Sequence, residues 1–171
     1  WSQMEKGNWD LYARRFDPAK QEWGALERLT SDPLPDVNPR LASDGKGGMA
    51  VAWQAFRARK DAAPNGPGPR PFSNIMMKAL AGERWGMDVR ITDHAANDWE
   101  PALAFDASGT AWVVWDTYAP GNYDVMMSRV SAGGQPGAPM AVASTPRFEV
   151  RPTVAVDTAG GSVATFPPPH Q

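Results

Sequence analysis

One motif, repeated three times, limits the folds open to this chain. Each copy begins with a proline and continues with an aspartate five residues later, a glycine three residues after that, and an aromatic residue nine residues after the aspartate. An apolar run fills the interval between the glycine and the aromatic residue. The copies span Pro39–Trp53, Pro101–Trp115 and Pro152–Phe166. Each copy is typical of two short strands joined by a tight turn, which the repeated aspartates Asp44, Asp106 and Asp157 are expected to serve.

Two further strands are predicted after each aromatic residue. A third strand begins at Asp10, Asn74 and Asp124, and a 12-residue insertion, Arg59–Arg70, delays it in the middle copy. The fourth strands are expected at Trp23–Thr30, Trp85–Thr92 and Pro136–Ala143. Four short strands in about 50 residues are typical of one blade of a β-propeller. A β-sandwich with accidental self-similarity is the alternative.

We therefore predict an all-β fold, a β-propeller segment over residues 1–166 with three blade equivalents. It comprises a half-blade over residues 1–30, blades over residues 39–92 and 101–143, and a half-blade over residues 152–166. With the strands of a blade named A to D from the axis outward, the chain reads C-D, two complete blades, then A-B. We expect residues 167–171 to form a disordered tail, because their prolines lack the backbone donor that a sheet requires.

Three blade equivalents leave open strand edges at both ends of the chain, since propellers usually have four to eight blades. Exposed edges recruit other chains. Twofold symmetry is the commonest in soluble homo-oligomers, so the simplest completion is a homodimer in which two copies form a six-blade ring. The alternative is a piece of a longer chain that supplies the remaining blades.

Composition narrows the partners. The chain has no cysteine, which removes disulfides, thiolate nucleophiles and zinc–cysteine sites. The net charge of −2 and the lack of a basic run argue against nucleic acid. No apolar stretch reaches the length of a membrane helix, so no membrane partner is expected. The chain begins at Trp1 without a methionine, so the compartment stays open, with a periplasmic or extracellular location favoured.

The loops that lead into each strand A are acidic. An acid lies three residues before each repeated proline, at Asp36, Asp98 and Glu149, and Glu100 adds a fourth carboxylate. Carboxylates that crowd together raise one another's pKa unless a cation compensates them. These four residues therefore predict a site for a divalent cation, Ca²⁺ first, at the mouth of the propeller. His94 lies in the same loop, which leaves a transition metal as an alternative.

The same face supplies the other candidate site residues. His94 is the predicted general base, since the only other histidine, His170, lies in the tail. Trp99 has no aromatic counterpart in the other copies, so it is expected to be exposed. The residues expected to contact a substrate are Trp99, Asn38, Arg151, Arg57 and Asp116. In the structural alternative, the acids cap turns or pair with Arg40 and Arg151.

The repeat resembles those of TolB-like and sialidase-like propellers. The segment Asn97–Ala104, followed by Val114–Tyr118 and Gly121–Asp124, is most similar to propeller regions attached to uncharacterised bacterial PHP-like metallohydrolases. The resemblance spans nearly the whole chain and implies a propeller fold. The arginines and the acid–tyrosine pair of a sialidase have no place in this sequence, so sialidase activity is not implied.

Two functions follow from these patterns. The first is a metal-dependent hydrolase of esters, lactones or phosphotriesters, in which the acids hold the cation and His94 activates water. Six-blade propellers with an axial Ca²⁺ include such enzymes, so this expectation rests on analogy of fold. The second is a non-catalytic propeller module, cut from a larger protein, that binds a small molecule or a protein.

Overall fold

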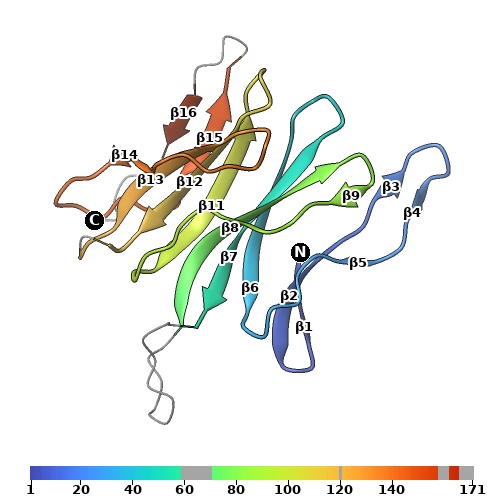
Figure 1. Ribbon diagram of the computed structural model, residues 1–171, viewed down its shortest axis with the longest axis horizontal. Coiled ribbons are helices and arrows are strands. Elements are labelled where there is room, and N and C mark those ends of the chain that lie inside the picture. Colours follow the sequence, from blue (N-terminus) through green and yellow to red (C-terminus); the bar gives the residue numbers. More distant parts are fainter. Residues whose placement is uncertain (59–70, 120, 158–161, 166–171) are drawn as a thin grey trace.

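The protein is all-β. The computed structural model describes residues 1–58, 71–119 and 121–157, and the backbone of residues 162–165. Within these ranges the chain forms strands and turns and no helix, and the sheets are antiparallel without closing into a barrel. It follows that these ranges hold no helix that could span a membrane. The successive sheets lie one after another along the molecule, from the blue N-terminal strands to the red C-terminal strands (Figure 1).

Sheet 1 is the N-terminal sheet, and it is short. It comprises β1 (Ser2–Glu5), β2 (Asn8–Ala13) and β5 (Glu27–Arg28) in that spatial order. A separate two-stranded ladder, β3 (Phe16–Asp17) with β4 (Glu22–Trp23), continues outward from it. The predicted third and fourth strands of this copy, over residues 10–16 and 23–30, are therefore broken into shorter pieces.

Sheet 2 is the largest sheet. Its strands follow the spatial order β6 (Asp36–Ser43), β7 (Met49–Arg57), β8 (Phe72–Ala81) and β10 (Val89–Arg90), and β9 (Arg84–Trp85) also pairs with β8. Consecutive strands are neighbours, as predicted for the repeat. The 12-residue insertion between β7 and β8 lies outside the described residues.

Sheets 3 and 4 complete the series. Sheet 3 has the order β11 (Asp98–Phe105), β12 (Ala111–Thr117), β13 (Asp124–Val130) and β14 (Met140–Ala143). Sheet 4 pairs β15 (Thr153–Val156) with β16 (Ser162–Thr165), followed by the predicted tail, which lies outside the described residues. The first strand of sheet 3, β11, contacts both β6 and β15, so the first strands of sheets 2, 3 and 4 lie next to one another.

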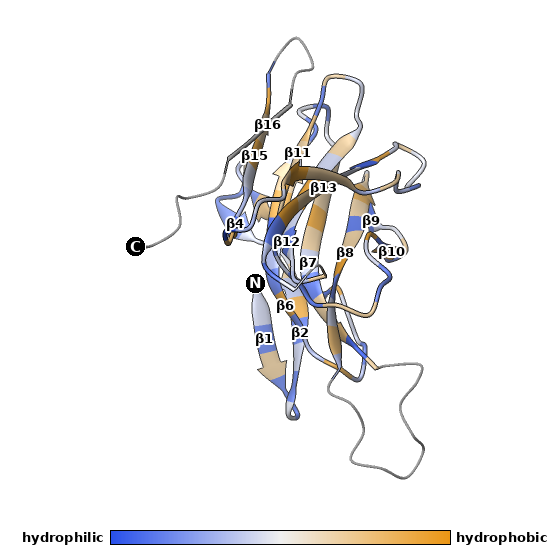
Figure 2. Cartoon of the chain, turned by 90° about the vertical axis from the view of Figure 1, so that its left-hand side faces the viewer, coloured by the Kyte–Doolittle hydropathy of each residue, from blue (hydrophilic) through white to orange (hydrophobic). Residues whose placement is uncertain are grey.

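Two apolar clusters hold successive sheets together. Side chains alternate between the two faces of each strand, so one sheet can pack against a neighbour on either side. Between sheets 1 and 2, Leu11 and Leu29 pack against Val51 and Trp53. Between sheets 2 and 3, Ala52 and Ile75 meet residues that include Val113 and Trp115. Strands β7, β8 and β13 carry much of the hydrophobic colour in Figure 2. A sheet that lies between two others buries one face against each of them, so its strands need apolar residues on both faces.

The turn after the first strand of sheets 2 and 3 is built as the sequence predicts. Asp44 Oδ1 accepts hydrogen bonds from the backbone of Lys46 and Gly48, at 2.7 and 2.8 Å. Asp106 Oδ1 accepts from the backbone of Ser108 and Thr110, at 2.9 and 3.0 Å. Gly47 and Gly109, which follow, adopt φ of 96° and 86°, a conformation that glycine reaches without strain.

A β-bulge includes the repeated proline in sheets 2 and 3, which the sequence alone does not indicate. In sheet 2 the register shifts between Val37 and Arg40, so that Asn38 and Pro39 together oppose one residue of β7. The same shift occurs between Trp99 and Ala102 in sheet 3. The residue before the proline has a left-handed φ in all three copies, at 54° for Asn38, 45° for Glu100 and 54° for Arg151. The same unfavourable backbone conformation therefore recurs at the equivalent residue of all three copies, at one end of the sheets.

Candidate functional site

The candidate site lies at the end of the sheets where the first strand begins and the second strand ends. In sheet 2, Asp36 opens β6 and Arg57 closes β7. Antiparallel pairing sets Asp36 opposite Ala55, two residues before Arg57, which brings the two charged side chains together. Asp98 opens β11 in the same way and lies opposite Thr117.

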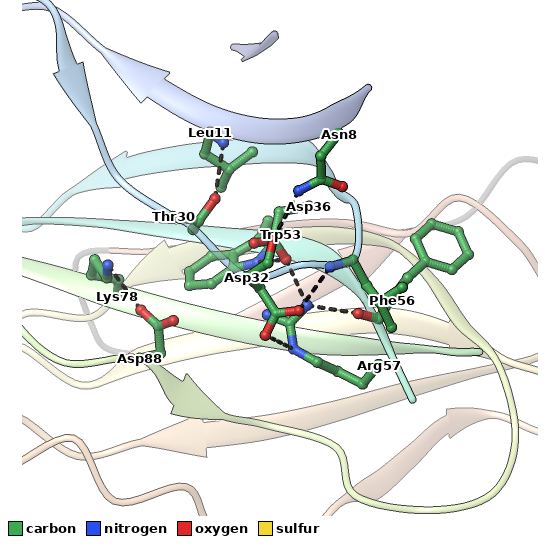
Figure 3. A network of polar contacts seen from close by, with 11 residues as sticks. Asn8, Leu11, Thr30, Asp32, Asp36, Trp53, Phe56, Arg57, Lys78 and Asp88 are labelled. Atoms are coloured by element: carbon green, nitrogen blue, oxygen red, sulfur yellow. Dashed lines mark hydrogen bonds and ion pairs between the residues drawn. The ribbon is translucent and has the colours of Figure 1, made fainter. Parts of the chain in front are cut away.

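Sheet 2 fills this position with a buried charge cluster, drawn in Figure 3. The indole Nε1 of Trp53 donates to Asp36 Oδ1 at 2.9 Å, and Arg57 NH1 donates to the same oxygen at 2.9 Å. Arg57 Nε lies 3.4 Å from Asp32 Oδ2. The Asp36 side chain is fully buried and that of Arg57 is 13% exposed. Burial raises the pKa of Asp36, while Arg57 and then Trp53 act in the opposite direction.

Sheet 3 repeats the cluster without its arginine. Asp98 and Trp115 take the places of Asp36 and Trp53, His94 takes that of Asp32, and Ala119 takes that of Arg57. His94 Nε2 lies 3.3 Å from Asp98 Oδ2. Both carboxylate oxygens of Asp98 are buried without a well-formed hydrogen bond from a described residue, although the side chains of Thr92, Thr117 and Trp115 lie close enough to lower its pKa. Burial raises the pKa of Asp98, which the neighbouring threonine side chains and His94 oppose.

A cavity of about 510 Å³ opens where the arginine is missing. Its lining includes His94, Trp115, Thr117, Ala119, Asp124 and Ser144. Asp124 is 5% exposed, and its Oδ2 accepts a hydrogen bond from Ser144 Oγ at 2.6 Å. The other oxygen of Asp124 and the indole nitrogen of Trp115 are buried without a hydrogen-bond partner in the part of the chain that the structure describes.

A second group of candidate residues surrounds the bulges. Asp116 is buried, and its Oδ1 accepts from the backbone of Arg151 at 3.4 Å. Burial, helped by the negative charges of Glu100 and Asp98, raises the pKa of Asp116 to about 6, against the backbone hydrogen bond from Arg151, which lowers it. Glu100 Oε2 lies 3.4 Å from Arg40 NH2, which is one of the pairings in the structural alternative.

Two further candidates, Asn38 and Glu149, have local partners. Asn38 Nδ2 donates to Gln54 Oε1 at 3.1 Å, so it holds the middle strand of its own sheet. Glu149 is buried, and its carboxylate accepts hydrogen bonds from the backbone and the hydroxyl of Thr145. Glu149 therefore caps its own loop, as the structural alternative predicts.

Trp99 is less accessible than expected. Its ring meets that of Phe56 edge-on, with 6.2 Å between the centroids, and its side chain is half-buried. The indole nitrogen is buried, and no hydrogen bond reaches it among the described residues. Trp99 therefore contributes to packing between sheets 2 and 3, and a substrate contact would be limited to the exposed part of its ring.

The predicted calcium ligands do not form a recognisable metal site within one copy of the chain. Among residues 1–58, 71–119 and 121–157, no three histidine, aspartate or glutamate side chains could share a metal ion. Asp36 already has a cationic partner in Arg57, and Glu149 is engaged by its own loop. A calcium site formed by Asp36, Asp98, Glu100 and Glu149 stays a prediction.

Sequence reasoning missed how the clusters differ. Ala119 occupies the same position of the repeat as Arg57, and His94 the same position as Asp32, so the exchange is visible once the copies are aligned beyond the repeated aromatic residue. The spacing of the acids predicts a set that faces the axis, whereas Asp36 and Asp98 are fully buried.

Comparisons with known proteins add no identity to this geometry. No protein-family model matches the sequence, and no curated protein sequence matches it.

Proposed function

We propose that this chain is a β-propeller-type binding module that assembles with a second copy of itself, with the two copies forming a six-blade ring. The resemblance to TolB-like repeats belongs to this proposal. The observation that carries it is the match between the open edge of sheet 1 and the strand pair of sheet 4.

Sheet 1 lacks the first strand that sheets 2, 3 and 4 possess. Its first strand, β1, corresponds to the second half of β7, because Trp1 lies opposite Tyr12 as Trp53 lies opposite Met76. Past Tyr12, on the side of β2 that pairs with β1, no strand of the described residues pairs with residues 13–15. An apolar pocket of about 320 Å³ lies at this edge, with Trp1, Tyr12 and Leu41 in its lining.

The exposed aromatic residues of this region support an interface. Trp85 is half-buried, and its indole nitrogen donates to Glu27 Oε2 in sheet 1 at 3.1 Å. Trp23 occupies the same place one repeat earlier, and it is 62% exposed. A further sheet packed on sheet 1 would cover Trp23 as sheet 1 covers Trp85. Exposed apolar surface of this kind is typical of interaction sites.

Sheet 4 contains the strands that sheet 1 lacks. Strand β15 corresponds to β6, and β16 corresponds to the first half of β7, which is the half that sheet 1 lacks. When placed by the repeat, β16 of a second copy continues the line of β1 and pairs with residues 13–16. The same placement sets Val150 of the second copy opposite Ser2, as Val37 lies opposite Gln54.

Binding is better supported than hydrolysis. The buried acids have internal partners or are isolated from one another, and the described residues offer no set of three ligands for a metal. The hydrolase predicted from the acidic loops would therefore need ligands brought together by assembly. A binding module requires no such set of ligands.

The proposal is tested by the mass of the folded protein in solution. Sedimentation equilibrium should give about 37 kDa, twice the 18.5 kDa of one chain. Trp23→Asp should weaken association at least tenfold, whereas the control Met87→Asp, at a residue that is 86% exposed on sheet 2, should not. A folded species of 18.5 kDa at micromolar concentration contradicts the assembly. Hydrolysis of esters, lactones or phosphotriesters that is abolished by EDTA contradicts the purely binding role.

A further inference from the structure

We propose that the cavity between His94, Ala119 and Asp124 binds the guanidinium group of a ligand, either a small guanidino compound or an arginine side chain. The cavity lies within a single chain, so this inference does not rest on the ring proposed above. It rests on what fills the same place elsewhere in the chain.

The repeat provides an internal comparison. In sheet 2 the guanidinium group of Arg57 contacts Asp36 at 2.9 Å and Asp32 at 3.4 Å. In sheet 3 Ala119 stands in place of Arg57, and its small side chain leaves the cavity of about 510 Å³ open. A volume of this size is within the range of small-molecule sites.

Asp124, the second acid of the cavity, also has a counterpart that binds an arginine. Asp124 heads the third strand of sheet 3, and its counterpart in sheet 1 is Asp10. Asp10 Oδ2 is contacted by Arg28 NH2 at 2.6 Å. Asp98 and Asp124 thus each have a counterpart bound by an arginine, while the described lining of the cavity holds neither lysine nor arginine.

Unsatisfied groups face the cavity. Asp124 lines it, is 5% exposed, and has one buried oxygen without a hydrogen bond from any described residue. Asp98 lies behind the lining, with Oδ2 3.3 Å from His94 Nε2, and the neutral side chains of Thr92, Thr117 and Trp115 are its other nearby donors. Buried acceptors without donors are costly, and a charged donor satisfies them best. Guanidinium has five donors and no acceptor, which suits this set better than a neutral ligand.

His94 controls access to Asp98. Its Nδ1 accepts a hydrogen bond from the backbone of Ala96 at 3.3 Å, so Nε2 is the nitrogen directed at Asp98. A guanidinium group that reaches Asp98 must displace this contact. Replacement of His94 by aspartate, which is the residue at this position in sheet 2, should therefore strengthen binding.

The test is a titration of the folded chain with methylguanidinium, followed by calorimetry and by the NMR signal of the Trp115 indole. We expect one site, a shift of that indole signal, and at least tenfold weaker binding of urea, which has a similar shape and no charge. Agmatine and an N-acetyl-arginine amide then distinguish a free guanidino compound from an arginine within a polypeptide. The tighter of the two identifies the source.

Variants provide the controls. Ala119→Arg should fill the cavity with the chain's own guanidinium and reduce binding at least tenfold, and Asp124→Asn should weaken it by a similar factor without filling the cavity. Arg57→Ala should open a second cavity beside Asp36 and Asp32, and this second site should bind more weakly than the first because Asn74 stands in place of Asp124. His94→Asp should tighten binding at least threefold.

Two results would overturn the inference. The first is the absence of saturable methylguanidinium binding to the folded wild-type chain. The second is binding that Asp124→Asn leaves unchanged. The mass of each sample is measured in parallel, so that a failure of assembly is distinguished from a failure of the cavity to bind.

Discussion

The buried pair of Arg57 and Asp36 gives the most quantitative prediction. Arg57→Met keeps the apolar stem of the side chain and removes the guanidinium group. This leaves the fully buried Asp36 with neutral donors, the Trp53 indole and the Thr30 hydroxyl. Removal of one partner from a buried ion pair costs about 3–5 kcal/mol. For a chain of this size, 1 kcal/mol corresponds to a change in Tm of about 2–4 °C. The expected fall in Tm is therefore roughly 6–20 °C.

The assay is urea unfolding at pH 7.5 and constant protein concentration, followed by tryptophan fluorescence. Asp36→Asn and the double variant complete a mutant cycle. The double variant should recover at least about 2 kcal/mol of the loss, because it buries no uncompensated charge. Asp36 without Arg57 has a still higher pKa, so the deficit of Arg57→Met should shrink as the pH falls and Asp36 takes up a proton. A loss below about 1 kcal/mol, or additive effects in the cycle, would refute the structural role assigned to the pair.

Three other substitutions test separate parts of the account. Asp116→Asn should stabilise the protein by up to about 3 kcal/mol at pH 8 and have little effect at pH 4. The pKa of Asp116 is raised to about 6, so the buried carboxylate becomes charged, and lowers the free energy of unfolding, as the pH rises through that value. Denaturant titrations at the two pH values measure the difference. Asp106→Ala should lower Tm at pH 7, and the difference should disappear as the pH falls from 4 toward the lowered pKa of about 2, as followed by thermal unfolding across that range. Glu100→Gly should leave the stability unchanged or raise it by up to about 1 kcal/mol, because glycine accepts the φ of 45°. The control Ala102→Gly, in the same strand, should destabilise the protein. Urea unfolding of the two variants distinguishes these outcomes.

Much of the fold could be predicted because the landmarks of the repeat recur at fixed spacing. The turn residue Asp106 and the buried Trp115 fall where the repeat places them, since local turn chemistry and strand alternation decide both. The left-handed backbone at Glu100 could not be predicted, because glutamate and the following proline both disfavour it. The bulge arises from pairing with β12, which the order of residues alone does not specify.

The site was harder to predict than the fold. The repeat identifies Asp36 and Asp98 as equivalent acids, but their burial depends on how the neighbouring sheet packs, which spacing does not specify. Sequence spacing indicated that the acids lie at one end of the sheets, and it could not indicate that Arg57 neutralises one of them and that a cavity adjoins the other. That difference rests on two exchanges between the copies: Ala119 stands in place of Arg57, and His94 stands in place of Asp32.

The assembly is tested most directly by a disulfide between two copies. The chain has no cysteine, so Ser2→Cys and Val150→Cys can be introduced singly without background reactions. When the two variants are mixed and oxidised under native conditions, the account predicts a cross-linked species that joins one copy of each, whereas Ser2→Cys mixed with Ser131→Cys should not form one. Equal cross-linking in both mixtures, or none in the first while the protein is folded, would contradict the claim that the open edge of sheet 1 receives sheet 4 of a second copy.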